Sequence, residues 1–251
     1  MGRVGIAHRV MRKTSFLAGK TVAVTGASGT LGRALIRELA KHGAKPIAVT
    51  HSGRTDIEGA ADTFTWQVGQ EALLKAQLQA VDILLINHGI NVHGERTATA
   101  IEASLEVNAL SAWRLMEVFL STVENAASHS AGHLPKEIWI NTSEAEVNPA
   151  FSPLYETSKR LIGDLITLRR QDAPCVMRKL ILGPFKSNLN PVGVMSADWV
   201  ASAIITLAQW DVRNIIVTIN PLTYLLFPLK ESFQSLYFKL FSQSKNLEAE
   251  G

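Results

Sequence analysis

Tyr155 and Lys159 are the pair of side chains in this sequence best suited to acid-base chemistry. Positions four apart on a helix share one face, so both groups can reach the same substrate if the segment is helical. A phenol has a reference pKa of about 10, and it transfers protons poorly at neutral pH unless a nearby cation stabilises its anion. The pair therefore predicts a proton donor, Tyr155, with Lys159 as its electrostatic partner.

A glycine-rich segment, TGASGTLG at positions 25–32, could hold a phosphate group. It follows a short β-branched run and precedes a stretch with helical apolar spacing, which is the context of a dinucleotide-binding turn. In such a turn the free N–H groups and the positive dipole end of the helix bind the pyrophosphate. We expect cofactor contacts from Gly26, Ser28, Gly29, Thr30, Leu31 and Gly32.

The end of the second predicted strand favours NADP(H) over NAD(H). A site for NAD(H) places an acid here, about 20 residues beyond the glycines. The chain instead continues as HSGR at positions 51–54, with no acid before Asp56. We expect His51, Ser52 and Arg54 to bind the 2′-phosphate, because a guanidinium forms charge-assisted hydrogen bonds with phosphate oxygens. The alternative is that Arg54 is a solvated loop residue.

Hydrophobic patterning places these residues on an alternating series of strands and helices. Strands are predicted at 21–25, 46–50, 64–67, 81–87, 137–141, 175–182 and 214–219, and helices at 31–42, 71–80, 98–126, 158–169 and 199–209, the last capped by Ser196. This alternation predicts an α/β fold, a Rossmann-like, doubly wound parallel sheet of about seven strands with helices on both faces. We assign residues 1–20 to a basic N-terminal extension, 21–219 to an NADP-binding catalytic domain and 220–251 to an apolar C-terminal segment.

The order of the motifs resembles that of the short-chain dehydrogenase/reductase family over about residues 17–219. The matching motifs are the glycine turn, Asn87-His88-Gly89 after the fourth strand, Asn108 in the next helix, Thr142-Ser143 after the fifth strand, and Tyr155 with Lys159. The resemblance implies that Ser143 hydrogen-bonds the substrate oxygen and Tyr155 donates or accepts the proton. It also implies that Lys159 binds the nicotinamide ribose and lowers the tyrosine pKa, and that Asn108 holds a water relay. Further cofactor contacts are implied for Asn87, His88, Gly89, Gly183, Pro184 and Ser187, besides Tyr155 and Lys159.

Three details depart from the main branch of that family. The glycine spacing resembles its extended branch, and Gly183-Pro184 stands where the family usually has Pro-Gly. Ser143 precedes Tyr155 by one position fewer than is usual, and the usual spacing would select Thr142 as the catalytic hydroxyl. Glu144 and Glu146 follow the serine closely, and we expect them to point away or to meet a polar substrate group, since an acid near Tyr155 would raise its pKa.

Charge and cysteine content exclude several kinds of partner. A formal charge of +3 from 25 basic and 22 acidic residues is too balanced to indicate nucleic-acid binding. The single cysteine, Cys175, cannot form an internal disulfide and fits a reducing compartment. No stretch of about 18 apolar residues predicts a membrane span. We expect a cytoplasmic homo-oligomer without a metal, and peripheral contact with a membrane stays open.

The segment NPLTYLLFPLKESFQSLYFKLF, which begins at Asn220, is unusually apolar. Its residues at helical spacing are Leu229, Phe233, Leu236, Tyr237, Leu240 and Phe241. Such a stripe should be buried against the body of the protein or a second subunit; the alternatives are an interfacial helix on a membrane or a lid over an apolar substrate. This tail and the segments NTSEAEVNPAFSPLYETSK and GPFKSNLNP are similar to the reductase portion of bifunctional sterol desaturase/short-chain dehydrogenase proteins, which implies a small apolar or lipid-like substrate.

Together these patterns predict an NADP(H)-dependent oxidoreductase that interconverts a carbonyl and an alcohol, such as a carbonyl reductase. Two alternatives stay open. One is a nucleotide-sugar epimerase or dehydratase of the extended type, suggested by the glycine spacing, and the other is a non-catalytic NADP-sensing protein.

Overall fold

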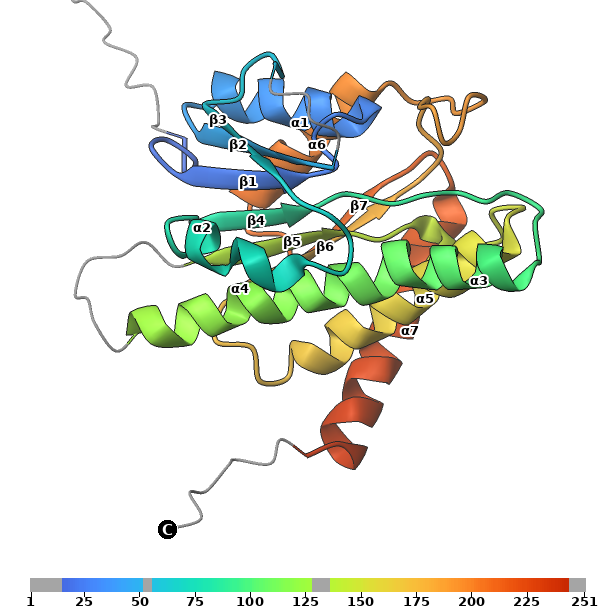
Figure 1. Cartoon of the computed structure of the whole chain (residues 1–251). Helices are drawn as coiled ribbons and strands as arrows, with labels where there is room; N and C mark the ends of the chain where they lie inside the picture. The colour runs from blue at the N-terminus through green and yellow to red at the C-terminus, as the bar shows by residue number, and fades with distance from the viewer. Residues whose placement is uncertain (1–14, 52–55, 128–135, 244–251) are drawn as a thin grey trace, which may run out of the picture.

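The structure is a computed structural model that describes residues 15–51, 56–127 and 136–243. Its centre is one sheet of seven strands in the order β3-β2-β1-β4-β5-β6-β7 (Figure 1), and every neighbouring pair is parallel. The strands are β1 (Thr21–Thr25), β2 (Lys45–Thr50), β3 (Asp62–Thr65), β4 (Ile83–Ile86), β5 (Glu137–Asn141), β6 (Val176–Leu182) and β7 (Asn214–Val217). The central strands are buried on both faces, as their runs of Val, Ile and Leu predict.

Helices cover both faces of this sheet (Figure 1). The helices are α1 (Thr30–Lys41), α2 (Lys75–Gln79), α3 (Ala98–Leu105), α4 (Ser111–Ala127), α5 (Pro153–Arg169), α6 (Ala197–Gln209) and α7 (Pro221–Phe241), with short turns η1 (Glu71–Leu74), η2 (Glu106–Leu110) and η3 (Glu144–Glu146). One hydrophobic core joins α1 and α6 to the sheet, and a second joins α2, α4 and α5 to its other face. This doubly wound arrangement confirms the predicted Rossmann-like fold.

The predicted helix at 98–126 is interrupted in its middle. Helix α3 ends at Leu105, and the chain passes through η2, one turn of π-helix, before α4 begins at Ser111. Turns of this kind are uncommon and concentrate at functional sites. Helix α5 also differs from the prediction, because it begins at Pro153 and not at position 158. Proline is favoured in the first turn of a helix, where its missing N–H costs nothing, and this places Tyr155 inside the helix.

Part of the predicted N-terminal extension packs against the domain. Leu17 is fully buried in the core beside α1, and the ring of Phe16 stacks on Trp139 with 6.3 Å between ring centroids. Residues 15–20 therefore belong to the folded body, and positions 1–14 lie outside the described residues.

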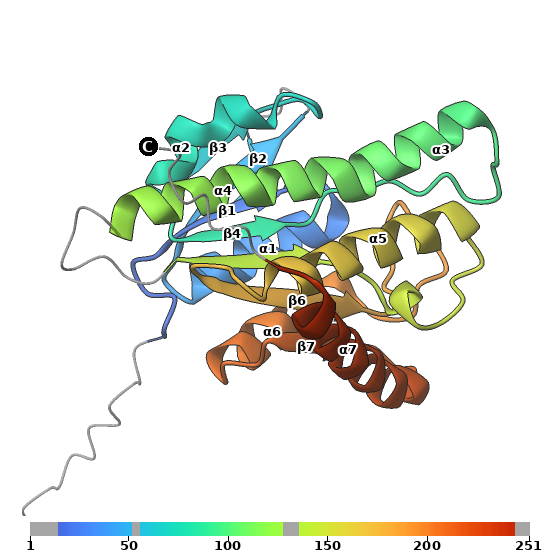
Figure 2. The ribbon, with the colours of Figure 1, turned by 90° about the horizontal axis from the view of Figure 1, so that it is seen from below.

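The apolar stripe of the C-terminal segment lies on a helix, as predicted, but it is not buried within this chain. Helix α7 packs beside α5 (Figure 2), and its side chains Leu229, Phe233, Leu236, Tyr237, Leu240 and Phe241 are all at least half exposed. Of the two predicted ways of burying this stripe, packing against the body of this chain does not occur, because the inward side of the helix carries Thr223, Phe227 and Glu231 instead. Within the described ranges, none of the helices is sufficiently long and apolar to span a membrane.

Candidate active site

The glycine turn between β1 and α1 can be built only with glycines at two positions. Gly26 has a φ of +62°, and a Cβ atom there would lie 2.9 Å from the Cα atom of His88. A Cβ atom on Gly32 would lie 2.7 Å from the Cα atom of Ala27. Gly29 precedes the first turn of α1. It has no side chain that could accept hydrogen bonds from the free N–H groups of that turn. The turn therefore presents backbone N–H donors and the positive end of the α1 dipole, as a pyrophosphate requires.

Thr25, at the end of β1, joins this turn to the segment after β4. Its Oγ1 atom accepts hydrogen bonds from the backbone N–H of Asn87 (2.9 Å) and of His88 (3.3 Å), and lies 2.8 Å from Nδ1 of His88. Burial lowers the pKa of His88 to about 3, so its ring is neutral at physiological pH, and the ring packs edge-on against Trp66. His88 thus supports the cofactor turn with its side chain as well as its backbone.

Asn108 lies in the π-turn η2 and holds two segments together. Its side-chain amide donates to the carbonyl of Ile90 (3.0 Å) and to Oγ of Ser158 (3.0 Å), while its Oδ1 accepts from the N–H of Ile90 (2.8 Å). Asn108 lies within the π-turn. From there its side chain reaches both the loop after β4 and helix α5. Ser158, one residue before Lys159, was not singled out from the sequence, since serine in a helix carries no distinctive signal.

The structure distinguishes the two candidate hydroxyl groups that follow β5. Thr142 is buried, and its Oγ1 donates to the carbonyl of Leu180 in the neighbouring strand (3.3 Å). Ser143 is the N-cap of η3, where its Oγ accepts a hydrogen bond from the N–H of Ala145 (3.1 Å), and its hydroxyl lies near enough to the Tyr155 phenol to lower the pKa of that phenol. The geometry therefore brings Ser143, and not Thr142, to the phenol.

Lys159 lies one helical turn beyond Tyr155, and its ammonium group faces the same region. Its Nζ donates to the backbone carbonyl of Asn141 (3.0 Å) and lies 5.7 Å from the centroid of the Tyr155 ring. Burial lowers the pKa of Lys159 to about 8, against the attraction of the Glu146 carboxylate, so the group is mainly charged at neutral pH. Asn141 was also missed by the sequence analysis, because its contribution here is a backbone carbonyl that any residue could supply.

The pKa of Tyr155 is raised and not lowered, in contrast to what the family resemblance implied. Burial of the phenol has the largest effect, and the hydrogen bond with Ser143 opposes it by lowering the pKa. The carboxylate of Glu144 raises the pKa further, because a nearby anion disfavours the phenolate. Tyr155 is therefore a protonated donor at neutral pH in this structure.

We expected Glu144 and Glu146 to point away or to meet a polar substrate group. They do not point away, and both bond to other parts of this chain. The carboxylate of Glu144 accepts hydrogen bonds from Oγ1 of Thr218 (2.6 Å) and of Thr223 (3.0 Å), which lie after β7 and at the start of α7. Glu146 is buried and forms an ion pair with Lys230 of α7 (2.8 Å). The two acids anchor the segment after Ser143 to the C-terminal helix.

We predict that Glu144→Gln lowers the pKa of Tyr155, because it removes a negative charge and keeps a side chain of similar size. Alcohol oxidation requires the phenolate, so its pH profile should move toward lower pH, by up to about one unit. The measurement is kcat/KM for oxidation as a function of pH, with Glu102→Gln, on an exposed position of α3, as the control. A profile that stays in place or moves upward would show that Glu144 does not set this pKa.

The remaining predicted site residues that the structure describes lie at the same carboxyl edge of the sheet. The hydroxyl of Ser28 accepts from Thr50 (3.4 Å), His51 is exposed at the end of β2, and Ser52 and Arg54 lie outside the described residues. Gly183 and Pro184 follow β6, where the N–H of Gly183 donates to the carbonyl of Val217 (2.9 Å). The described residues contain no cluster of three side chains able to hold a metal ion.

A pocket of about 960 Å³ lies between the start of α1 and the loop after β6. Thr30 and Ser187, two predicted cofactor contacts from distant parts of the chain, both line it. Arg33 and Lys186 line it as well and bring positive charge, which suits phosphate groups. Sequence reasoning missed these two basic residues, because only the fold places them beside the glycine turn.

The fold and this set of residues agree with the comparisons with known proteins. Residues 20–173 match the family described as short chain dehydrogenase. Monoglucosyldiacylglycerol epimerase of Synechocystis sp. is 54% identical over 248 residues, which are 96% of this chain and 60% of that protein. L-rhamnose 1-dehydrogenase (NAD(P)(+)) of Azotobacter vinelandii is 27% identical over 149 residues, which are 58% of this chain and 51% of that protein. The chain thus spans well under two thirds of the length of each of these relatives.

Solved structures show the same fold at low sequence identity. A short chain dehydrogenase from Burkholderia cenocepacia in complex with NADP superposes with a TM-score of 0.71 at 19% identity, covering 90% of this chain and 99% of that one. A short-chain dehydrogenase from Sphingobium yanoikuyae in complex with NADPH gives 0.69 at 18% identity, covering 92% and 99%. This chain belongs to the short-chain dehydrogenase/reductase family of oxidoreductases.

Proposed function

We propose that this chain is an NADP(H)-dependent enzyme that interconverts a hydroxyl and a carbonyl group on the sugar of a glycolipid, so that the net reaction inverts that hydroxyl. The observation that carries the substrate class is the 54% identity, over 96% of this chain, to a protein named monoglucosyldiacylglycerol epimerase. The chemistry is supported by the Ser143 hydroxyl beside the Tyr155 phenol, with the Lys159 ammonium group beside the phenol ring.

Inversion of a secondary hydroxyl requires an oxidation and a reduction at the same carbon. In the oxidation, the hydroxyl proton passes to the phenolate oxygen of Tyr155, while the C–H bond breaks and its electron pair departs from the carbon with the hydrogen. When bound, NADP(H) would accept and return that pair as a hydride at its nicotinamide ring. In the reduction, Tyr155 returns the proton to the carbonyl oxygen while the new C–H bond forms on the opposite face. Ser143 donates a hydrogen bond to the same oxygen in both steps, and protons and electrons balance over the cycle.

The residues around the glycine turn fit a dinucleotide cofactor. Gly26 and Gly32 leave no room for a Cβ atom, so the backbone of the turn can approach a pyrophosphate closely. Arg33 and Lys186 line the adjoining pocket. Lys159 would bind the nicotinamide ribose, the function that the family resemblance implied for it.

The test is to supply purified protein with monoglucosyldiacylglycerol in detergent micelles and a small amount of NADP. NMR spectroscopy should detect the lipid with an inverted sugar hydroxyl, without net change in NADPH absorbance, because the electron pair is returned in each cycle. Stoichiometric NADPH consumption on ketones without inversion would instead show a carbonyl reductase. Turnover of UDP-glucose in place of the lipid would show a nucleotide-sugar epimerase, and tight NADPH binding without any turnover would support an NADP-sensing protein.

We predict that NADPH binds at least about tenfold more tightly than NADH, equivalent to about 1.4 kcal/mol. The reason is the absence of an acid after β2 and the presence of Arg54 in its place. Fluorescence titration with both cofactors measures the preference, and Arg54→Ala should reduce it. Arg213→Ala, on the exposed residue that precedes β7, is the control and should leave the preference unchanged. Tighter binding of NADH, or an unchanged preference in Arg54→Ala, would contradict the assignment.

A further inference from the structure

Helix α7 has an inverted polarity, with polar side chains facing the protein and apolar side chains facing solvent. Thr223 and Glu231 are buried at its inward side together with Phe227. Eight large side chains on its outward side are between 50% and 74% exposed. We call these residues the outer face of α7, and they are Leu222, Leu225, Leu229, Phe233, Leu236, Tyr237, Leu240 and Phe241.

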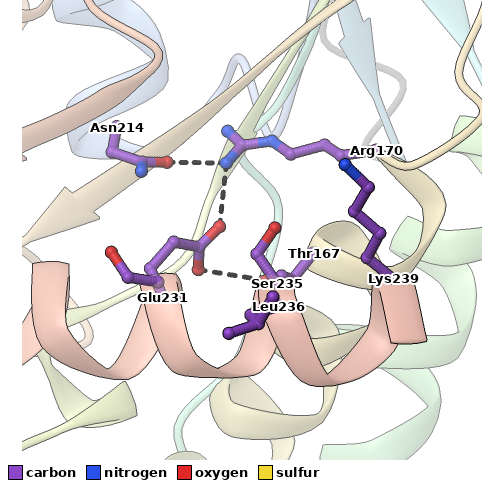
Figure 3. A pocket seen from close by; sticks show the side chains of 8 residues that line it. Thr167, Arg170, Asn214, Glu231, Ser235, Leu236 and Lys239 are labelled. Carbon is purple, nitrogen blue, oxygen red and sulfur yellow. Dashed lines mark hydrogen bonds and ion pairs between the residues drawn. The ribbon is translucent and has the colours of Figure 1, made fainter. Parts of the chain in front are cut away.

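Buried charge pairs fix the rotation of α7 about its own axis (Figure 3). The carboxylate of Glu231 accepts hydrogen bonds from Nζ of Lys179 (2.7 Å), from Nη1 of Arg170 (3.0 Å) and from Oγ1 of Thr167 (3.0 Å). Turning the outer face inward would break these bonds and leave Lys179, which is fully buried, with Glu146 (3.6 Å) in place of two carboxylates. The exposure of the outer face is therefore imposed by the fold.

Two lysines of α7 lie beside its outer face, and one of them, Lys230, is paired with Glu146 (2.8 Å) and Asp164 (2.9 Å). Helix α7 contains three charged residues, and its one acid, Glu231, faces inward. Lys239 is exposed, and among the described residues it has no hydrogen-bond or ion-pair partner. It lines a pocket of about 450 Å³ together with Arg170, Glu231 and Leu236, and the Glu231 carboxylate is paired there with Arg170 (3.0 Å) (Figure 3). The Nε–H of Arg170 is buried and also has no partner within the described parts of the chain.

We propose that the outer face of α7 docks onto the surface of a lipid bilayer that contains anionic lipids. The helix would lie in the plane of the interface, with the outer face among the acyl chains and with Lys239 and the adjoining pocket at the level of the anionic headgroups. Aromatic residues near the end of the helix, Tyr237 and Phe241, suit this interfacial depth. If two copies paired through this face, their basic side chains would come together. The acid of α7, Glu231, faces inward and could not pair with them.

The start of α7 connects this surface to the candidate active site. Oγ1 of Thr223 donates to Glu144 (3.0 Å) and accepts from Nδ2 of Asn148 (2.9 Å), and both partners lie in the segment that follows Ser143. Docking would therefore bring the carboxyl edge of the sheet toward the lipid surface. Phe151 and Val192, in loops at this edge, are 96% and 86% exposed and add apolar side chains there.

The experiment is flotation of the full chain with vesicles of phosphatidylcholine, with and without phosphatidylglycerol, in the absence of substrate and cofactor. We expect binding to the anionic vesicles that is at least tenfold weaker in Phe233→Ser/Leu240→Ser, with an unchanged thermal unfolding midpoint because both side chains are exposed. Lys239→Gln should weaken binding to the anionic vesicles and leave binding to neutral ones unchanged. Leu73→Ser, on an equally exposed leucine of η1, is the matched control and should bind like the original protein.

Two outcomes would overturn the proposal. One is a protein that floats with neither kind of vesicle. The other is a protein that sediments as a dimer, that the Phe233→Ser/Leu240→Ser substitutions convert to a monomer, and that does not bind vesicles, which would make a second copy the occupant of the outer face. Because binding is measured without turnover, neither outcome depends on the proposed reaction.

Discussion

Replacing Tyr155 with phenylalanine is expected to lower kcat by about 10²- to 10⁴-fold, the usual contribution of one positioned acid-base group. The phenol beside the Ser143 hydroxyl is the proposed proton donor, and phenylalanine preserves the ring but not the hydroxyl. NADPH affinity should stay nearly unchanged, because the cofactor turn is built from other segments. The measurements are turnover with the glycolipid and NADPH titration by fluorescence.

Two further variants make this result specific. Glu102→Gln, on an exposed position of α3 outside both proposed sites, should leave kcat unchanged. Lys159→Ala should reduce both turnover and NADPH affinity, since its ammonium group is placed to meet the ribose as well as the phenol. If Tyr155→Phe and the original protein turned over at comparable rates, the proposed mechanism would be wrong.

Replacing Lys179 with methionine is expected to lower the free energy of unfolding by about 3–5 kcal/mol, the usual cost of removing one partner of a buried ion pair. The ammonium group of Lys179 is fully buried, donates to Thr167 and Glu231 (both 2.7 Å), and lies 3.6 Å from Glu146. Methionine fills a similar volume but leaves two carboxylates with fewer partners. For a domain of this size the melting temperature should fall by about 10 °C or more.

Urea unfolding followed by circular dichroism measures this loss. Lys41→Met is the control, because Lys41 forms an exposed ion pair with Glu38 (3.0 Å), and such pairs contribute less than about 1 kcal/mol. The double variant Lys179→Met/Glu231→Gln should regain part of the stability, since it removes one of the stranded charges. Equal losses in Lys179→Met and Lys41→Met would show that the buried network contributes little to stability.

The sequence predicted the sheet and the motifs well because both depend on local patterns. A run such as ILLI in β4 shows a doubly buried strand by composition alone, and the glycines at 26 and 32 mark a turn that no other residue could form. The π-turn at Asn108 could not be predicted, because it depends on bonds from one amide to the loop after β4 and to α5. The start of α5 was misplaced because hydrophobic spacing marks the middle of a helix better than its first turn, and the first-turn signal of Pro153 was not used.

By itself, the sequence determined the fold class, the glycine turn and the identity of the Tyr155 and Lys159 pair, since each follows from residue type and spacing along a short segment. The tertiary structure alone decided which hydroxyl meets Tyr155, in which direction its pKa moves, and which side of α7 faces solvent. These depend on strands and helices distant in the chain, such as β6, which supplies Lys179 to hold Glu231 inward. Burial and charge pairing are properties of the assembled fold, and the pattern of a single segment does not contain them.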